Sequence, residues 1–289
     1  MQTGPADHDA LVACLDFHVA SGIDLALDEE PHDRFVEDGQ ASAEEPLPAP
    51  GPAPVPASSA PNRVPVRAAA ALPRAATARP DDIAADARAQ AGEARTLAEL
   101  EAIVAAFDGC SLKASARQLV FADGVPGSRV MVLGESPGAE EDRTGRPFVG
   151  RAGQLLDRML AAIELDRTGI YIANIVPWRP PGNRTPTPQE VAICLPFTHR
   201  QIELAAPEFL VTVGAPSTQT LLGMTEGITR TRGRWFDQTI GDLRLRVLPM
   251  LHPAYLLRQP LHKRFAWRDL RLLKRALEAA PASDQARQP

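Results

Sequence analysis

One short apolar run of this sequence is followed by residues that together could hold a flat ligand and activate water. After residues 130–133 come a turn-forming stretch, four carboxylates and one aromatic ring: Gly134, Glu135, Ser136, Pro137, Gly138, Glu140, Glu141, Asp142 and Phe148. Gly and Pro permit a sharp turn, carboxylates can act as general bases, and a Phe ring offers an apolar face. A solvated surface turn beside a core Phe would have the same composition, so this segment alone does not establish a function.

A second candidate is Asn174, which ends the buried-looking stretch 171–174. Its amide presents a donor beside an acceptor and can read an edge that carries a carbonyl next to an N–H, as in uracil or thymine. Asn at a strand end is also a common turn former. Asn174 alone therefore does not indicate a function.

The third candidate is the segment 251–258, which contains His252 before Pro253. A fixed His can donate a hydrogen bond to an oxygen that gains negative charge in a transition state. Tyr255, Leu256 and Leu257 are candidate wedges for a base stack, and Arg258 could hold a phosphate. The three candidates lie at or just beyond the ends of predicted strands.

Strand-like and helix-like runs alternate through the sequence and must position these residues. The predicted strands are 130–133, 170–176, 209–213 and 245–250, and the predicted helices are 153–163, 188–204, 216–222 and 262–277. Val, Ile and Leu runs separated by helices are typical of a parallel sheet covered on both faces. We expect a three-layer α/β/α fold with a central, mostly parallel four-stranded sheet, whose ligand sites lie at the carboxyl ends of the strands.

Composition divides the chain into unequal parts. We expect an acidic segment over 1–38 with a possible short helix, an Ala/Pro-rich disordered linker over 39–90, a catalytic domain over 91–280 and a disordered tail over 281–289. Residues 1–90 carry a net charge of −9 and the remainder +4, so an acidic tail precedes a basic domain. A basic field suits a polyanion, and Arg184, in the Pro/Gly-rich loop 179–184, is a further candidate DNA contact.

The cysteines and the hydropathy exclude other classes. Cys14, Cys110 and Cys194 are too few and too scattered for a disulfide framework, and their spacing does not match a zinc site. No apolar run reaches membrane-spanning length, and the N-terminus lacks a signal-like pattern. We therefore expect a soluble, cytoplasmic protein.

Taken together, the motifs resemble the uracil-DNA glycosylase superfamily, specifically its family 4. The likeness runs from about residue 97 to residue 277 and is carried by 134–160, 171–190, 194–196 and 251–258. It implies an enzyme of base excision repair that flips uracil out of DNA and hydrolyses its N-glycosidic bond. The implied partner is uracil-containing DNA, the implied state is a monomer, and the segment 1–38 could bind a protein partner.

The resemblance also implies roles for single residues. Glu135, Glu141 and Asp142 would position or activate water, and Phe148 would stack on the base beside Gly134 and Ser136. Asn174 would read the edge of the base, and His252 would stabilise the uracil anion as the bond breaks. Tyr255, Leu256, Arg258 and Arg184 remain the candidate DNA contacts on the ground of their residue types and positions.

The sequence departs from family 4 at the cofactor. The family holds a [4Fe–4S] cluster through four Cys, and such clusters require thiolate ligands. Cys110 and Cys194 match two of these positions, but Phe107 and Trp178 occupy the other two. We therefore predict that the protein has no cofactor and that Cys110 and Cys194 are vestigial, with a bound cluster as the alternative.

Three other interpretations remain open on the sequence, and a fourth is disfavoured. One is a glycosylase that stays covalently attached to DNA, although the basic insertion of that branch is absent before His252. Another is a wider range of bases, which Ser136 would permit. A third is a DNA-binding or lesion-binding protein without turnover. A phosphate loop at 134–138 is disfavoured because the nearby carboxylates repel phosphate and the P-loop Lys is missing.

Overall fold

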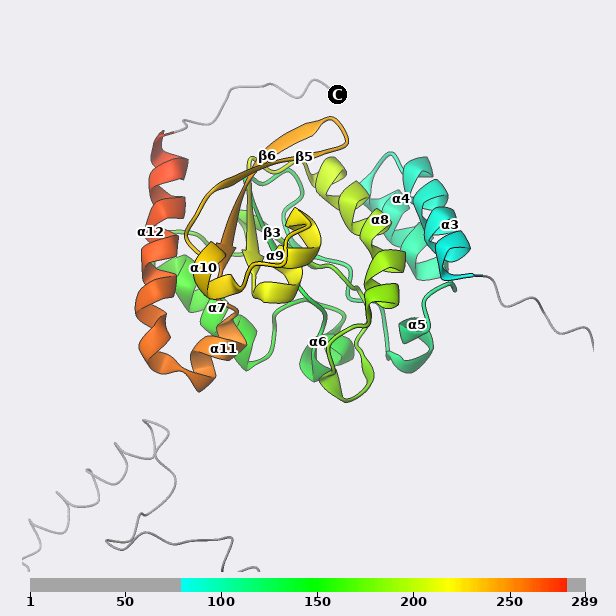
Figure 1. Cartoon of the computed structure of the whole chain (residues 1–289), viewed down its shortest axis with the longest axis horizontal. Coiled ribbons are helices and arrows are strands. Elements are labelled where there is room, and N and C mark those ends of the chain that lie inside the picture. The colour runs from blue at the N-terminus through cyan, green and yellow to red at the C-terminus, as the bar shows by residue number, and fades with distance from the viewer. Residues whose placement is uncertain (1–78, 280–289) are drawn as a thin grey trace, which may run out of the picture. The chain divides into compact units, whose positions relative to one another are not determined.

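A six-stranded sheet forms the centre of the computed structural model, which describes residues 79–279 (Figure 1). The strand order is β1-β3-β2-β4-β6-β5. The predicted acidic segment 1–38, most of the predicted linker and the predicted tail 281–289 lie outside the described residues. Within 79–279, no helix is long and apolar enough to cross a membrane.

The four predicted strands are the four parallel strands of the sheet. They are β2 (Val130–Gly134), β3 (Ile170–Asn174), β4 (Phe209–Val213) and β6 (Leu243–Met250). Strands β2, β3 and β4 are buried along their whole length, as expected for apolar runs covered on both faces. Gly134 pairs in register with Asn174, so the ends of β2 and β3 coincide. The predicted α/β class and mostly parallel sheet are confirmed.

The sheet has two more strands than the four we expected, and both are antiparallel edge strands. β1 (Asp123–Gly124) pairs with β3, and β5 (Phe236–Ile240) pairs with β6. A strand of two residues leaves no periodic signal. β5 alternates partly buried and exposed residues and reads as a polar stretch, because an edge strand has one solvated face.

Alternate residues of the strands enter two separate cores. Val130 and Val132 of β2 face one apolar cluster, and Met131 and Leu133 face the other. The first cluster lies under α7 (Arg151–Ala161), α11 (Pro253–Arg258) and α12 (Lys263–Ala279), and the second under α3 (Pro80–Glu93), α4 (Leu97–Ala106) and α8 (Pro188–Ala205). Figure 1 shows these two sets of helices on opposite sides of the sheet. This is the three-layer arrangement.

Helix α3 corrects the start of the folded domain. It begins at Pro80, within the linker that we expected to extend to residue 90. Ala87 and Ala91 are buried, so this helix belongs to the folded core. An Ala-rich stretch has a composition that suits both a linker and a helix, since Ala has the highest helix propensity.

Helix α8 begins at Pro188, as the sequence predicts. The hydroxyl of Thr187 accepts from the backbone N–H of Glu190 at 3.2 Å, and the Glu190 carboxylate accepts from the N–H of Thr187 at 2.7 Å. The remaining elements are α5 (Leu112–Ser115), α6 (Ala139–Thr144), α9 (Ala215–Leu222), α10 (Ile228–Thr231) and the 3-10 turns η1 (Pro181–Asn183) and η2 (Pro260–His262).

Candidate active site

The carboxyl ends of β2, β3, β4 and β6 open into one cavity of about 720 Å³. Six of the predicted catalytic and base-binding residues line it: Glu135, Ser136, Glu141, Phe148, Asn174 and His252. Residues that are up to 117 positions apart in the chain, Glu135 and His252, therefore meet at one edge of the sheet, which is where ligand sites of this architecture form.

Gly134 allows the base-reading candidates to approach each other. A Cβ atom at this position would lie 2.6 Å from Cζ of Phe148 and would also overlap Oδ1 of Asn174. The ring and the amide therefore lie directly over the backbone at the end of β2. Asn174 is only 5% exposed, so its amide is presented to the cavity rather than to bulk solvent.

His252 lies next to Phe148 in the wall of the cavity. The two ring centroids are 5.8 Å apart with an interplanar angle of 32°. Gly214 follows β4 with a φ of 97°, and a Cβ there would lie 3.3 Å from Cβ of His252. Only glycine adopts this backbone conformation readily, so Gly214 both turns the chain and leaves room for the imidazole.

The hydrogen bonds of His252 fix which of its nitrogens carries the proton. Its Nδ1 accepts from the backbone N–H of Ala254 at 3.0 Å, where His252 caps the start of α11. Burial lowers the pKa of His252 to about 4, and Arg258 acts in the same direction. The ring is therefore neutral near pH 7, with its proton on Nε2, which makes Nε2 a hydrogen-bond donor.

Glu135 has the one carboxylate oxygen in the described part of the chain that is buried without a hydrogen-bond partner, Oε1. Burial raises the pKa of this carboxyl above its ordinary value of 4.5, and a hydrogen bond from Thr185 opposes the rise. Glu135 also lines the cavity, and its Oε1 has acceptor capacity that no protein donor uses.

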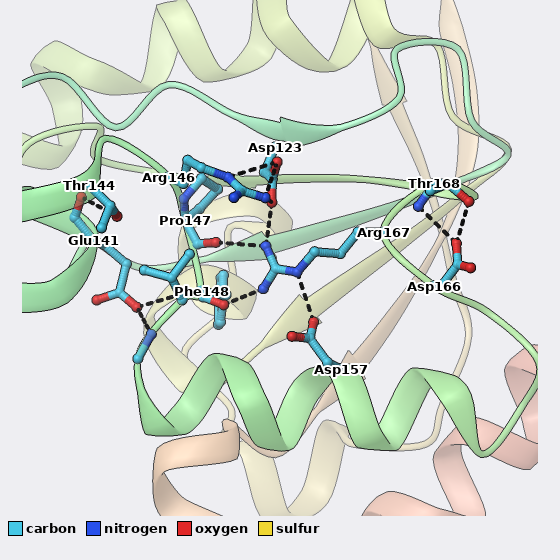
Figure 2. Close-up of polar contacts among 12 residues, drawn as sticks. Asp123, Glu141, Thr144, Arg146, Pro147, Phe148, Asp157, Asp166, Arg167 and Thr168 are labelled. Atoms are coloured by element: carbon cyan, nitrogen blue, oxygen red, sulfur yellow. Dashed lines mark hydrogen bonds and ion pairs between the residues drawn. The ribbon is translucent and has the colours of Figure 1, made fainter.

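Glu141 lines the same cavity, but its carboxylate is already bound to the backbone (Figure 2). Oε1 accepts from the N–H groups of Val149 and Gly150, each at 2.9 Å, and Oε2 accepts from the N–H of Gly138 at 3.1 Å. These bonds tie the two ends of the loop together. Glu141 therefore holds the loop in place, and its expected part in positioning or activating water stays a prediction.

Asp142 does not line the cavity. It is 2% exposed, and its Oδ1 accepts from the N–H of Arg117 at 2.8 Å while Oδ2 lies 3.8 Å from a guanidinium nitrogen of Arg179. Asp142 and Glu141 are neighbours in a helix, so their side chains point in different directions. The predicted catalytic role of Asp142 is not supported by this position.

Two of the four predicted DNA contacts lie at the cavity and two do not. Tyr255 and Arg258 line it, and the Tyr255 hydroxyl is 2.7 Å from Nδ1 of His262. Leu256 is completely buried in the core beneath α7, so the prediction that it is a wedge was wrong. The guanidinium of Arg184 binds both carboxylate oxygens of Glu190, at 2.7 and 2.8 Å. This pairing ties Arg184 to the first turn of α8, and its contact with DNA stays a prediction.

Several lining residues were missed from the sequence. Gly214 was detectable, since it directly follows the predicted strand 209–213. Ile228 and Thr229 come from the one-turn helix α10, which is too short to give a periodic signal. Asn183 lines the cavity from the loop 179–184 with a φ of 56°.

The residues at the four predicted cluster positions lie in one apolar core on the side of α3, α4 and α8. Sγ of Cys194 is 3.8 Å from Sγ of Cys110, and both cysteines are buried and free. Phe107 and Trp178 are buried in the same core, at 4% and 2% exposure. Between Arg79 and Ala279, no group of three or more His, Cys, Asp or Glu side chains could hold a metal ion.

Comparison with known proteins agrees with this geometry. The sequence profile of the family described as Uracil DNA glycosylase superfamily matches residues 121–271. The chain is 43% identical over 150 residues to a type-4 uracil-DNA glycosylase of Thermotoga maritima, covering 52% of this chain and 77% of that protein. It is 36% identical over 177 residues to the type-4 enzyme of Saccharolobus solfataricus, covering 60% and 82%. The matched region contains every strand of the sheet and the whole candidate site, and the chain belongs to the uracil-DNA glycosylase superfamily.

Proposed function

We propose that this protein is a uracil-DNA glycosylase that removes uracil from DNA and leaves an abasic site. The observation that carries the proposal is the meeting of Phe148, Asn174 and His252 in one cavity at the carboxyl ends of the sheet. The family membership and the type-4 relatives support the same activity.

Recognition would depend on Phe148 and Asn174. A uracil flipped out of the helix would stack on the Phe148 ring, and the Asn174 amide would accept from N3–H and donate to O4. Thymine has the same hydrogen-bonding edge and differs by its 5-methyl group. Exclusion of thymine would therefore depend on the space that the cavity leaves beside C5 of the pyrimidine.

Departure of the base would depend on His252. As the bond between C1′ and N1 breaks, its electron pair moves onto the uracil, and O2 gains negative charge. The neutral imidazole would donate its Nε2–H to that oxygen. A neutral donor suits this role because it is fixed by the Ala254 N–H and retains its proton over the physiological pH range.

Attack by water would depend on Glu135. Its ionised carboxylate would favour the positive charge that develops on the sugar and would accept a proton from the water whose oxygen bonds to C1′. The uracil anion is then protonated from solvent after it leaves. Glu135 is preferred to Glu141 because only Glu135 has an oxygen without a partner.

We further propose that the protein works without an iron-sulfur cluster. A [4Fe–4S] cluster takes four thiolates, and Phe107 and Trp178 supply none, so the residues present do not fit the group. Their buried rings instead pack in the core that contains Cys110 and Cys194. Iron and acid-labile sulfide should be absent from protein purified without oxygen, and about four irons per chain would contradict this.

The activity is tested with oligonucleotides that contain one uracil, followed by alkaline cleavage of abasic sites. We expect the wild-type chain to cut at uracil and not at thymine, and His252→Ala, Asn174→Ala and Glu135→Ala to lose most of the rate. Full activity in all three variants would refute the site assignment, and protein that migrates with the DNA under denaturing conditions would indicate covalent attachment. We also propose that the protein is a monomer, that it acts in the cytoplasm and that residues 1–38 bind a protein partner.

A further inference from the structure

Phe148 has a backbone conformation that its own side chain does not favour. Its φ is 54°, in the left-handed region that bulky residues rarely adopt. Such a conformation persists only when its surroundings fix it, and it occurs often at ligand sites. The backbone of Phe148 is packed closely against Gly153 of α7, where a Cβ atom would overlap the Phe148 carbonyl.

One side chain holds the carbonyl groups on this segment, and it comes from a loop outside the cavity (Figure 2). Arg167, between α7 and β3, donates from Nη2 to the carbonyl oxygen of Phe148 and from Nη1 to that of Pro147 at 3.1 Å. Glu141 binds the following N–H groups of Val149 and Gly150. The peptide groups on both sides of the Phe148 ring are therefore held by charged side chains.

Arg167 is itself fixed by two carboxylates from different elements. Its Nε donates to Asp157 of α7 at 2.9 Å, and its Nη1 pairs with Asp123 of β1. The side chain is 21% exposed and Asp123 is 15% exposed, so this is a largely buried, paired guanidinium. The planar guanidinium can serve four acceptors at once, which a lysine ammonium cannot do in the same geometry.

The Arg167 loop is also held locally. Oδ1 of Asp166 accepts from the backbone N–H of Thr168 at 2.8 Å and from the Thr168 hydroxyl at 2.5 Å. These bonds close a small turn around Arg167, visible at the right of Figure 2. The guanidinium therefore starts from a fixed backbone position.

We propose that Arg167 is a positioning residue that fixes the Phe148 ring at the height and angle needed to stack on the extruded base. The inference rests on the proposed function, because the stacking role of Phe148 does. It assigns to the loop between α7 and β3 a part in base recognition, although no atom of Arg167 lines the cavity.

The test compares Arg167→Gln and Arg167→Lys with Arg146→Gln. Arg146 pairs with the same Asp123 but is 58% exposed, which makes it a matched control. We expect Arg167→Gln to lower kcat/KM for uracil excision by roughly 10- to 100-fold, because a base misplaced by about 1 Å from the reacting groups has a cost of that order. Arg167→Lys should retain thermal stability and still lose rate, and Arg146→Gln should behave as wild type.

Two further measurements separate positioning of the ring from general loss of structure. Affinity for DNA that contains 2′-fluoro-2′-deoxyuridine, which has the base but resists cleavage, should fall in Arg167→Gln. Affinity for DNA with a tetrahydrofuran abasic site should not fall, because no base is present to stack. In a Phe148→Ala background, Arg167→Gln should have little further effect on kcat/KM, since residues that act through one contact are not additive.

Three results would overturn the inference: wild-type kinetics in both Arg167 variants, an equal loss of affinity for the two DNAs, or full additivity with Phe148→Ala. Each of these is distinct from failure of the proposed function, which would appear as a wild-type chain that releases no uracil.

Discussion

Substitution of Gly134 by alanine should damage base recognition while leaving the fold intact. The new Cβ would lie 2.6 Å from Cζ of Phe148, whereas carbon atoms pack best about 3.5–4.0 Å apart. The ring must therefore retreat by about 1 Å, and the Asn174 amide must move as well. A displacement of this size costs about 100-fold in kcat/KM, or about 2.7 kcal/mol of transition-state stabilisation.

The assay measures uracil excision from a single-uracil duplex, together with thermal unfolding. Overpacking costs about 1–3 kcal/mol of stability, so Gly134→Ala should unfold several degrees lower and remain folded at 25 °C. Gly92→Ala is the control, because a Cβ at this helical position would have nothing within 4 Å. Affinity for abasic DNA should be unchanged in both variants.

A Gly134→Ala chain with wild-type kcat/KM would refute the reasoning. It would mean that neither the ring nor the amide needs its present position, and that the contact over Gly134 is only packing. A variant that loses affinity for abasic DNA as strongly as for uracil DNA would contradict the assignment of the effect to the base.

Three other changes test separate parts of the site. Burial raises the pKa of Glu135 above 4.5, and the ionised form is the active one. We therefore expect kcat to fall as the pH drops through this raised pKa. Glu135→Gln should abolish the dependence in a pH–rate profile. Glu141→Gln should lower the free energy of unfolding by about 1–3 kcal/mol, since one of three backbone N–H groups loses its acceptor. A loss of rate at unchanged stability would instead indicate that Glu141 is catalytic. Leu256→Ala should destabilise the fold by about 2–5 kcal/mol in chemical denaturation, because the residue is fully buried, and a purely DNA-binding defect would restore the wedge interpretation.

The sequence by itself determined the parallel centre of the sheet and the three segments that meet at its edge. Runs of Val, Ile and Leu between helices are typical of buried parallel strands. This pattern predicted strands at residues 130–133, 170–176, 209–213 and 245–250. Parallel strands place their carboxyl ends at a common edge. The residues after these runs, Glu135 and His252 among them, therefore converge whatever the details of packing.

Only the tertiary structure decided what each side chain is free to do. Glu135 and Glu141 are the same residue type and lie six positions apart between β2 and α7. In the folded chain the carboxylate of Glu141 accepts from three backbone N–H groups, whereas Glu135 keeps an oxygen without a partner. Leu256 was assigned to the wrong environment because the start of α11 at Pro253 sets which face of that short helix turns inward. Arg167 contacts Phe148 across 19 positions of sequence. Such pairings depend on the packing of distant elements, and no local pattern of residues encodes them.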